Sequence, residues 1–252
     1  MSGKVYLVGA GPGAPDLLTL RAAKLLAQAD IVFYDALVHS DTIALAEHAE
    51  KIAVGKRCGK ASTAQRFINK RLVDAAQKYQ TVVRLKGGDP MLFGRAQEEI
   101  DALESAAIEY EVVPGITAAL AASANLGISM TRRGLSRSVA FVTPRVAPGE
   151  AENDWIKSAI SADTVALYMA SGEAEEISAR LIGAGKSAGT PVAILENASL
   201  SNRRTIFSTL GNIAADIAQR QLSGPTLILL GEVYRQRAEQ LLEEVTLQEA
   251  SA

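Results

Sequence analysis

The chain has 252 residues, of which 48% are hydrophobic and 21% are charged, so it is long enough for one large or two smaller domains and is not a disordered protein. Its 26 basic and 28 acidic residues leave a net charge of −2, without the basic excess that is typical of nucleic-acid-binding proteins. One cysteine excludes an internal disulfide framework, and two histidines leave little for a transition-metal site.

Short apolar segments alternate with helical patterns through the first half of the chain. Continuous apolar runs of this length are typical of strands that are buried on both faces, and the β-α alternation predicts a parallel, doubly wound sheet. Strands are predicted at residues 5–8, 31–34, 51–54, 81–85 and 109–113, and helices at 16–29, 62–78 and 95–105.

An uncharged run over residues 112–131 is long enough to cross a bilayer, but it consists largely of Ala, Ser, Thr, Gly and Asn. We interpret it as a buried helix with flanking loops. The N-terminus lacks the pattern of a secretory signal, because its apolar stretch ends at Val8. These features predict a soluble cytoplasmic protein that has no membrane partner.

The second half carries further strands and helices, but no helix separates its third and fourth strands. That gap predicts an antiparallel pair, and therefore a mixed sheet. We place the boundary between two α/β domains near residues 132–137, which gives domains at 1–133 and 134–245. The predicted strands are 138–143, 164–169, 192–196, 204–209 and 226–232, and the helices are 154–161, 173–184, 212–219 and 235–244.

A glycine turn follows the first strand. Gly9-x-Gly11-x-x-Ala14 precedes a helix, and Asp35 ends the next strand, which is the context of a dinucleotide-binding fingerprint. A tight turn that binds nothing is the alternative. Pro12 and Pro15 count against a dinucleotide, because they remove amide donors from the turn.

A second glycine turn, residues 87–90, carries Asp89 at the end of another strand. Ligands of open parallel sheets bind outside the carboxyl ends of the strands, so the turns at 9–13, 87–90 and 114–118 are predicted to converge on one crevice. The Asp89 carboxylate suits a ligand with hydroxyl or ammonium groups better than one with phosphates. An ordinary Gly-Asp-Pro turn is the alternative.

An ordered series of motifs resembles the tetrapyrrole methyltransferase family. Each motif alone is weak, but together they run in order from about residue 4 to residue 234, nearly the whole chain. The motifs are VGAGPG at 8–13, DLLTLR at 16–21, VFYDALV at 32–38, VGKR at 54–57, VRLKGGDP at 83–90, FGR at 93–95, VPGITA at 113–118, TPVAILEN at 190–197 and GEV at 231–233.

The resemblance implies a two-domain α/β fold with an active site in the trough between the domains, a homodimer, and S-adenosylmethionine bound in a folded form. Asp35 and Lys56 match the positions that the family assigns as proton acceptor and proton donor. The matched cofactor contacts are Pro12, Gly87, Gly88, Asp89, Leu92, Thr117 and Ala118 in the first domain and Met169, Ala198 and Thr226 in the second.

The implied reaction sets the roles of these residues. Methyl transfer from a sulfonium is an in-line displacement that requires orientation of the reactants and no metal. Methylation of a pyrrole carbon leaves a cation that must lose a proton, and Asp35 is the base best placed by sequence. A turn or helix-capping carboxylate is the alternative for Asp35. Lys56 either donates a proton, binds a substrate carboxylate or belongs to a solvated basic turn.

The implied substrate is a macrocycle with acetate and propionate arms, which guanidinium groups bind two oxygens at a time. Arg95 begins a helix just beyond the second glycine turn. Glu98, one helical turn later, either binds pyrrole N–H groups or orients Arg95. Arg132, Arg133 and Arg137 cluster at the predicted domain junction, where a charged, soluble linker is the alternative.

Three more residues near these motifs carry weaker signals. Arg84 and Lys86 lie on one face of a predicted strand, where a structural role is the alternative to substrate binding. Cys58 stands beside a basic pair, but displacement from a sulfonium needs no thiol, so we interpret it as incidental.

The resemblance as a whole implies S-adenosylmethionine-dependent C-methylation of uroporphyrinogen III, in two transfers, to precorrin-2 for sirohaem- or cobalamin-type tetrapyrrole biosynthesis by a monofunctional enzyme. The sequence departs from the family pattern in four places and leaves open a methyltransferase of a later precorrin: Ala14, Ala96-Gln97, Pro144-Arg145 and Ala198. An RNA or protein methyltransferase of this fold, an NAD-dependent Rossmann oxidoreductase and a silent ligand-binding module are three further hypotheses.

Overall fold

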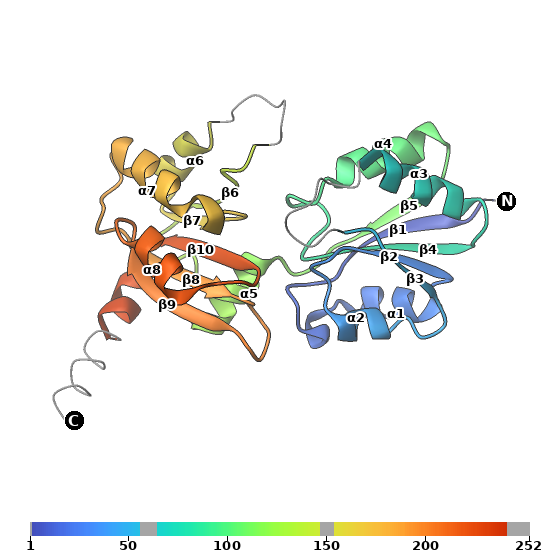
Figure 1. Ribbon diagram of the computed structural model, residues 1–252, viewed down its shortest axis with the longest axis horizontal. Coiled ribbons are helices and arrows are strands. Elements are labelled where there is room, and N and C mark those ends of the chain that lie inside the picture. Colours follow the sequence, from blue (N-terminus) through green and yellow to red (C-terminus); the bar gives the residue numbers. More distant parts are fainter. Residues whose placement is uncertain (1, 56–64, 147–153, 241–252) are drawn as a thin grey trace. The chain divides into compact units, whose positions relative to one another are not determined.

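The computed structural model describes residues 2–55, 65–146 and 154–240 (Figure 1). The chain divides into two compact units, Met1–Ala118 and Ala119–Ala252. Each unit has one five-stranded sheet, which confirms the predicted fold class of two α/β domains, the first with a parallel sheet and the second with a mixed one. Over the described ranges, no helix has the length and apolar character that a membrane span requires.

The first unit has five parallel strands in the order β3-β2-β4-β1-β5. Helices α1 and α2 cover one face of the sheet, and α3 and α4 cover the other (Figure 1). The elements are β1 (Lys4–Gly9), α1 (Leu20–Gln28), β2 (Ile31–Tyr34), α2 (Ser40–Ala44), β3 (Glu50–Ala53), α3 (Gln65–Ala76), β4 (Thr81–Lys86), α4 (Ala96–Ser105) and β5 (Tyr110–Val113).

The central strand β4 sends alternate side chains to the two faces of this sheet. Val83 and Leu85 pack in the core on the α1 side. Val82 packs in the core on the α3 side. Because strand side chains alternate, Arg84 and Lys86 share the Val82 face, and both are buried there. Two cations therefore enter an otherwise apolar layer, where they need carboxylate partners.

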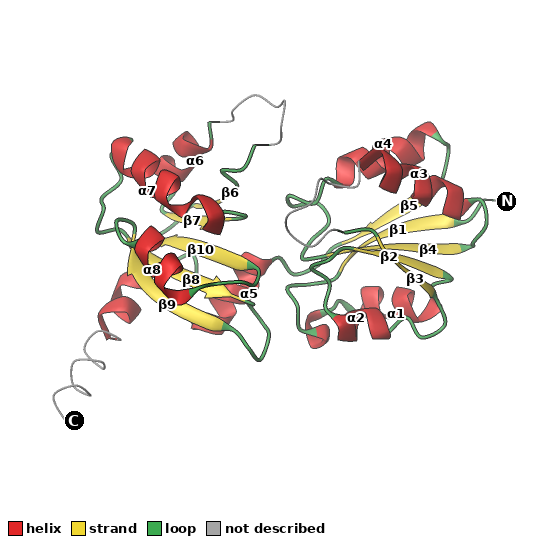
Figure 2. Cartoon of the chain, viewed as in Figure 1, coloured by secondary structure: helices red, strands yellow, loops and turns green. Residues whose placement is uncertain are grey.

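The second unit has a mixed sheet in the order β6-β7-β10-β8-β9 (Figure 2). Strands β6 and β7 are parallel, whereas the other three pairs are antiparallel, including the predicted β8–β9 pair. Helices α6, α7 and α8 pack on one face and α5 on the other. The elements are α5 (Ala118–Leu126), β6 (Val139–Val142), α6 (Trp155–Ser161), β7 (Thr164–Leu167), α7 (Ala174–Gly183), β8 (Pro191–Glu196), β9 (Arg204–Thr209), α8 (Ile213–Arg220) and β10 (Thr226–Gly231).

The structure differs from the prediction at two helices. The segment predicted as one helix from residue 16 begins with a single 3-10 turn, Pro15–Leu17, and α1 starts only at Leu20. The extended Thr19 separates them, and its Oγ1 accepts a hydrogen bond of 3.1 Å from the N–H of Ala22, which caps α1. The short helix α2 was not predicted; its five residues are too few to show a helical period.

The division between the units lies 15 residues before the predicted boundary at 133/134. Helix α5 explains the difference, because Ala119 and Ala122 pack against Leu195 and Leu229 of the second sheet. The segment that precedes the junction arginines in sequence is thus part of the second core. The small side chains of α5 allow this helix to pack closely on the sheet.

Candidate active site

Three turns at the carboxyl edge of the first sheet are in direct contact. Gly11 and Gly88 exchange backbone hydrogen bonds in both directions, at 3.2 and 2.7 Å, and form an isolated antiparallel bridge. A Cβ atom placed on Gly115 would lie 2.3 Å from the carbonyl oxygen of Gly88, so Gly115 has no room for a side chain. The turns that follow β1, β4 and β5 therefore converge, as the parallel topology predicts.

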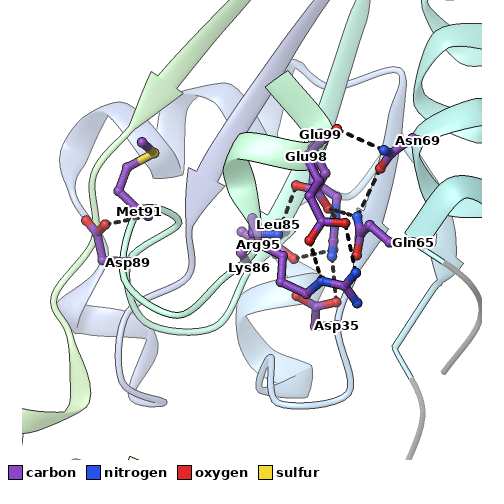
Figure 3. Close-up of polar contacts among 11 residues, drawn as sticks. Asp35, Gln65, Asn69, Leu85, Lys86, Asp89, Met91, Arg95, Glu98 and Glu99 are labelled. Atoms are coloured by element: carbon purple, nitrogen blue, oxygen red, sulfur yellow. Dashed lines mark hydrogen bonds and ion pairs between the residues drawn. The ribbon is translucent and has the colours of Figure 1, made fainter. Parts of the chain in front are cut away.

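Asp89 joins two of these turns. Its Oδ1 accepts the N–H of Met91 at 2.8 Å, within its own turn (Figure 3). Its Oδ2 accepts the N–H of Gly115 at 2.9 Å. One carboxylate thus holds the turn after β4 against the turn after β5. Each oxygen has a second lone pair, so the same group can still accept a hydrogen bond from a ligand.

The predicted cofactor positions of the first unit lie along this edge. The N–H of Leu92 donates to the carbonyl of Asp89 at 3.3 Å and closes the turn. A Cβ on Gly88 would meet only Thr117 Cα, at 3.9 Å, so the turn is open at that point to a ligand. The seven positions are all partly exposed: Pro12, Gly87, Gly88, Asp89, Leu92, Thr117 and Ala118.

Asp35 follows β2 at the same edge and is held by a buried arginine. Its Oδ1 accepts a hydrogen bond from Arg84 Nη2 at 2.7 Å, and 28% of its side chain is exposed. Gly55, which follows β3, packs against its backbone, since a Cβ on Gly55 would lie 2.8 Å from Asp35 Cα. Lys56, the predicted proton donor, lies outside the described residues, as does Cys58.

Arg84 belongs to a buried network of charges. Glu99 of α4 accepts Arg84 Nε at 2.9 Å on Oε1 and Lys86 Nζ at 2.8 Å on Oε2, and its side chain is fully buried (Figure 3). Burial lowers the pKa of Lys86, and the charge of Arg84 lowers it further. Burial also acts to lower the pKa of Arg84, but Glu99 and Asp35 outweigh it, and the net shift is upward. Both buried cations therefore have carboxylate partners.

Arg95 and Glu98 form a two-pronged ion pair at the start of α4. Arg95 Nε donates to Glu98 Oε1 at 2.6 Å and Nη2 donates to Oε2 at 2.8 Å, while about half of each side chain is exposed. Arg95 adopts a left-handed backbone conformation with φ of 54°, which is uncommon outside glycine. Of the two predicted roles of Glu98, orientation of Arg95 is the one that the geometry displays.

The three junction arginines lie on the surface of the second unit. Arg132, Arg133 and Arg137 are all exposed. The backbone of Arg132 pairs with Ser136 in an isolated bridge, and the N–H of Arg137 donates to Asp163 at 2.8 Å. The turn that carries these arginines is therefore fixed by its backbone, and its cationic side chains face solvent.

The predicted cofactor positions of the second unit gather at one edge of its sheet. Met169 follows β7 and is 47% exposed, with a φ of 56°. Ala198 follows β8, between Asn197 and Ser199, which both have positive φ. Thr226 opens the antiparallel β10 opposite Glu196, so it lies at the same edge. Left-handed backbone at residues other than glycine is costly and is concentrated at functional sites.

Two residues with a clear place in the structure are missed by pattern alone. Glu99 lies on the apolar stripe of α4 with Ala96, Ile100 and Leu103, and an acidic residue on such a stripe is the signal that was available for it. Tyr168, beside Met169, accepts the N–H of Ala119 at 3.1 Å through its hydroxyl, at the first turn of α5. No local sequence pattern predicts that contact, because the two residues are 49 positions apart.

Comparisons with known proteins agree with this geometry. Residues 4–214 match the family described as Tetrapyrrole (Corrin/Porphyrin) Methylases. A siroheme synthase of Psychrobacter cryohalolentis is 47% identical over 233 residues, which are 92% of this chain and 44% of that protein. The chain thus spans about half the length of the curated relatives it matches.

Solved structures extend the match to proteins of the same length. The uroporphyrin-III C-methyltransferase of Thermus thermophilus, in complex with S-adenosylhomocysteine, is 39% identical, with a TM-score of 0.81 over 92% of this chain and 99% of that one. The cobalt precorrin-4 methyltransferase CbiF is 28% identical, with a TM-score of 0.81 over 91% of this chain and 95% of that one.

Proposed function

Since this chain belongs to the tetrapyrrole (corrin/porphyrin) methylase family, we propose that it transfers two methyl groups from S-adenosylmethionine to carbon atoms of uroporphyrinogen III and forms precorrin-2. Precorrin-2 then serves the synthesis of sirohaem- or cobalamin-type tetrapyrroles. The 39% identity to the Thermus uroporphyrin-III C-methyltransferase, against 28% to the cobalt precorrin-4 methyltransferase, supports this substrate over a later precorrin.

The observation that carries the proposal is the convergence of the three turns after β1, β4 and β5. Their backbone is packed too closely for side chains at Gly9 and Gly115, yet it is open beside Gly88. Such an edge presents amide and carbonyl groups, and with them the Asp89 carboxylate, to a ligand with ammonium and hydroxyl groups. S-adenosylmethionine has both kinds of group.

The chain's own residues orient the reactants and handle a proton. When bound, S-adenosylmethionine supplies a methyl group activated by its sulfonium sulfur. The pyrrole carbon that receives the methyl group becomes part of a cation, which must lose a ring proton. Asp35 is the proposed acceptor, because it is a partly exposed carboxylate at the same edge as the cofactor turns. Lys56 keeps its proposed role as proton donor.

The polyanionic substrate is bound by arginines in this proposal. Arg95 presents a guanidinium whose position is set by Glu98, and the exposed Arg132, Arg133 and Arg137 supply further cations for the acetate and propionate arms. The contacts of the cofactor in the second unit are proposed at Met169, Ala198 and Thr226. The proposed enzyme is cytoplasmic and forms a homodimer. Light scattering after size exclusion tests the dimer.

The experiment is a direct assay. Purified protein, S-adenosylmethionine and uroporphyrinogen III are mixed without oxygen, and S-adenosylhomocysteine release and product mass are followed. The proposal requires two methyl groups per macrocycle. Release of S-adenosylhomocysteine only with a later precorrin would instead assign that acceptor. Tight binding of S-adenosylmethionine with no turnover on either compound contradicts an enzymatic role.

A further inference from the structure

Asp35 and Arg84 lie on the same face of the first sheet. Ile31 and Phe33 of β2 pack in the core on the α3 side, and Asp35, two residues further on, continues that alternation. In the register between β2 and β4, Phe33 is opposite Arg84. The carboxylate of Asp35 therefore approaches Arg84 diagonally across the two strands, within the 2.7 Å hydrogen bond.

The guanidinium of Arg84 is held by three acceptors. Nη2 donates to Asp35, Nε donates to Glu99 at 2.9 Å, and Nη1 donates to the carbonyl of Leu85 at 3.2 Å. Because the guanidinium is planar and its donors have fixed directions, contacts on two of its edges set the direction of the third. Asp35 thus receives a hydrogen bond from a donor that cannot rotate freely.

Glu99 is the most buried residue of this network. It is fully buried on α4, where it accepts Arg84, Lys86 and, at 3.1 Å, Gln65 Nε2 (Figure 3). Two cations face two carboxylates, so the buried charges balance. Exposure rises along the network from 0% for Glu99 through 3% for Arg84 to 28% for Asp35. The network therefore has one buried end and one end that reaches solvent, and the solvent end is the proposed base.

We propose that Arg84 is a positioning residue for Asp35: it holds the carboxylate in one orientation for proton acceptance, and Glu99 holds Arg84 in turn. This inference rests on the proposed function, since it requires that Asp35 accept a proton from the methylated ring. A base must meet the proton it removes within hydrogen-bond geometry, so an unanchored carboxylate reduces turnover and leaves substrate binding intact.

The test is a double-mutant cycle with Arg84→Lys and Asp35→Asn, read out as kcat and KM for uroporphyrinogen III. Lysine keeps the buried charge but cannot span both carboxylates. We expect Arg84→Lys to lower kcat about tenfold with KM and the Kd for S-adenosylmethionine changed less than about twofold. In the Asp35→Asn background the same substitution should change the residual kcat less than about twofold. The control is Arg21→Lys, at an arginine whose partner Glu111 is on the surface.

Three outcomes overturn the inference. An equal loss of kcat in both backgrounds means that Arg84 acts on the fold and not through Asp35, and unchanged kcat in Arg84→Lys means that it does not act at all. A crystal structure of Arg84→Lys gives a readout without turnover: the Asp35 carboxylate should leave its present orientation, and its retention contradicts the proposal. If the wild-type protein does not methylate uroporphyrinogen III, the proposed function has failed, independently of the network.

Discussion

Gly11 and Gly88 are hydrogen-bonded to each other through both of their backbone groups, so two turns from separate strands form one continuous edge. Gly88 has a φ of 68°, a conformation that glycine adopts without strain. Gly115 closes the edge from the third turn. Residues without side chains at these points let the three turns meet.

Gly115→Ala should damage both stability and cofactor binding. The added methyl group would lie 2.3 Å from the Gly88 carbonyl, and relief of that clash must move one of the two turns. We expect a loss of about 1–3 kcal/mol in the free energy of unfolding, measured with denaturant, and at least about a tenfold weaker affinity for S-adenosylmethionine. Gly172→Ala is the matched control, because a Cβ there meets no atom within 4 Å.

Asp89→Asn should weaken binding of S-adenosylmethionine, with a smaller effect on the free energy of unfolding than Gly115→Ala has. The amide keeps one acceptor oxygen, so either the Met91 N–H or the Gly115 N–H loses its partner. We expect a fall of about tenfold in affinity by calorimetry. Asp74→Asn, at an exposed carboxylate that pairs with Lys70 on α3, is the control and should bind as the wild type does. Equal affinities in both variants would show that the Asp89 carboxylate is not needed.

Asp35→Asn should reduce turnover and spare binding. An amide cannot accept the ring proton, and general-base catalysis contributes about 10²–10⁴-fold, so kcat is expected to fall by at least about a hundredfold. The Kd for S-adenosylmethionine should not change. Single-turnover methyl transfer from labelled cofactor is the measurement. A rate within about threefold of wild type assigns the base to another group.

Arg95→Gln should raise KM for the polyacidic substrate. The substitution keeps a polar side chain, but the chain is shorter and loses the charge and the two-pronged contact with Glu98. We expect KM for uroporphyrinogen III to rise about tenfold, with a weaker dependence of KM on salt. Arg180→Gln on α7, at an arginine that pairs with Glu176, is the comparison and should leave KM unchanged. An unchanged KM in Arg95→Gln would contradict a place for Arg95 in the substrate site.

Glu196 makes the second unit sensitive to acid. The hydrogen bond from Arg204 lowers its pKa to about 2 despite burial, with help from the backbone N–H groups of Ser223 and Gly224. Because the folded pKa lies below the unfolded one, this stabilisation is present above about pH 4.5 and is lost as the pH falls toward 2. It amounts to at most about 3 kcal/mol.

Glu196→Gln measures this contribution. The variant should be less stable than wild type at neutral pH, and the difference should shrink as the pH falls through that window. Thermal unfolding from pH 7 to pH 2 is the measurement. Glu176→Gln, at an exposed glutamate on α7, serves as the control. A stability gap between Glu196→Gln and wild type that does not depend on pH would contradict the assignment.

Local pattern was sufficient for most of the first sheet. The run Ile31–Tyr34 is apolar and is bounded by Asp30 and Asp35, and it forms β2 with the predicted ends. Parallel order then brings the glycine turns to one edge, because all strands of such a sheet end on the same side. The same reasoning does not find α2, which is a single short turn held by the His39 ring nitrogen and the N–H of Asp41.

The contacts that depend on tertiary packing were beyond the sequence pattern. Arg84 and Glu99 are brought together by the packing of α4 on β4, and nothing local to either segment selects that partner. The left-handed conformations of Met169 and Arg95 also carry no composition signal, since neither residue type favours positive φ. These positions are set by the surrounding fold, which imposes the strain.

The interlocked glycine turns separate two kinds of molecular recognition. On the proposed donor side, main-chain atoms form the edge, and a side chain added at Gly115 would displace the chain itself. On the proposed acceptor side, the candidate groups are half-exposed guanidinium side chains such as that of Arg95. Under the proposed function, a redesign for another macrocycle would therefore start from the arginine side chains and leave the glycine turns as they are.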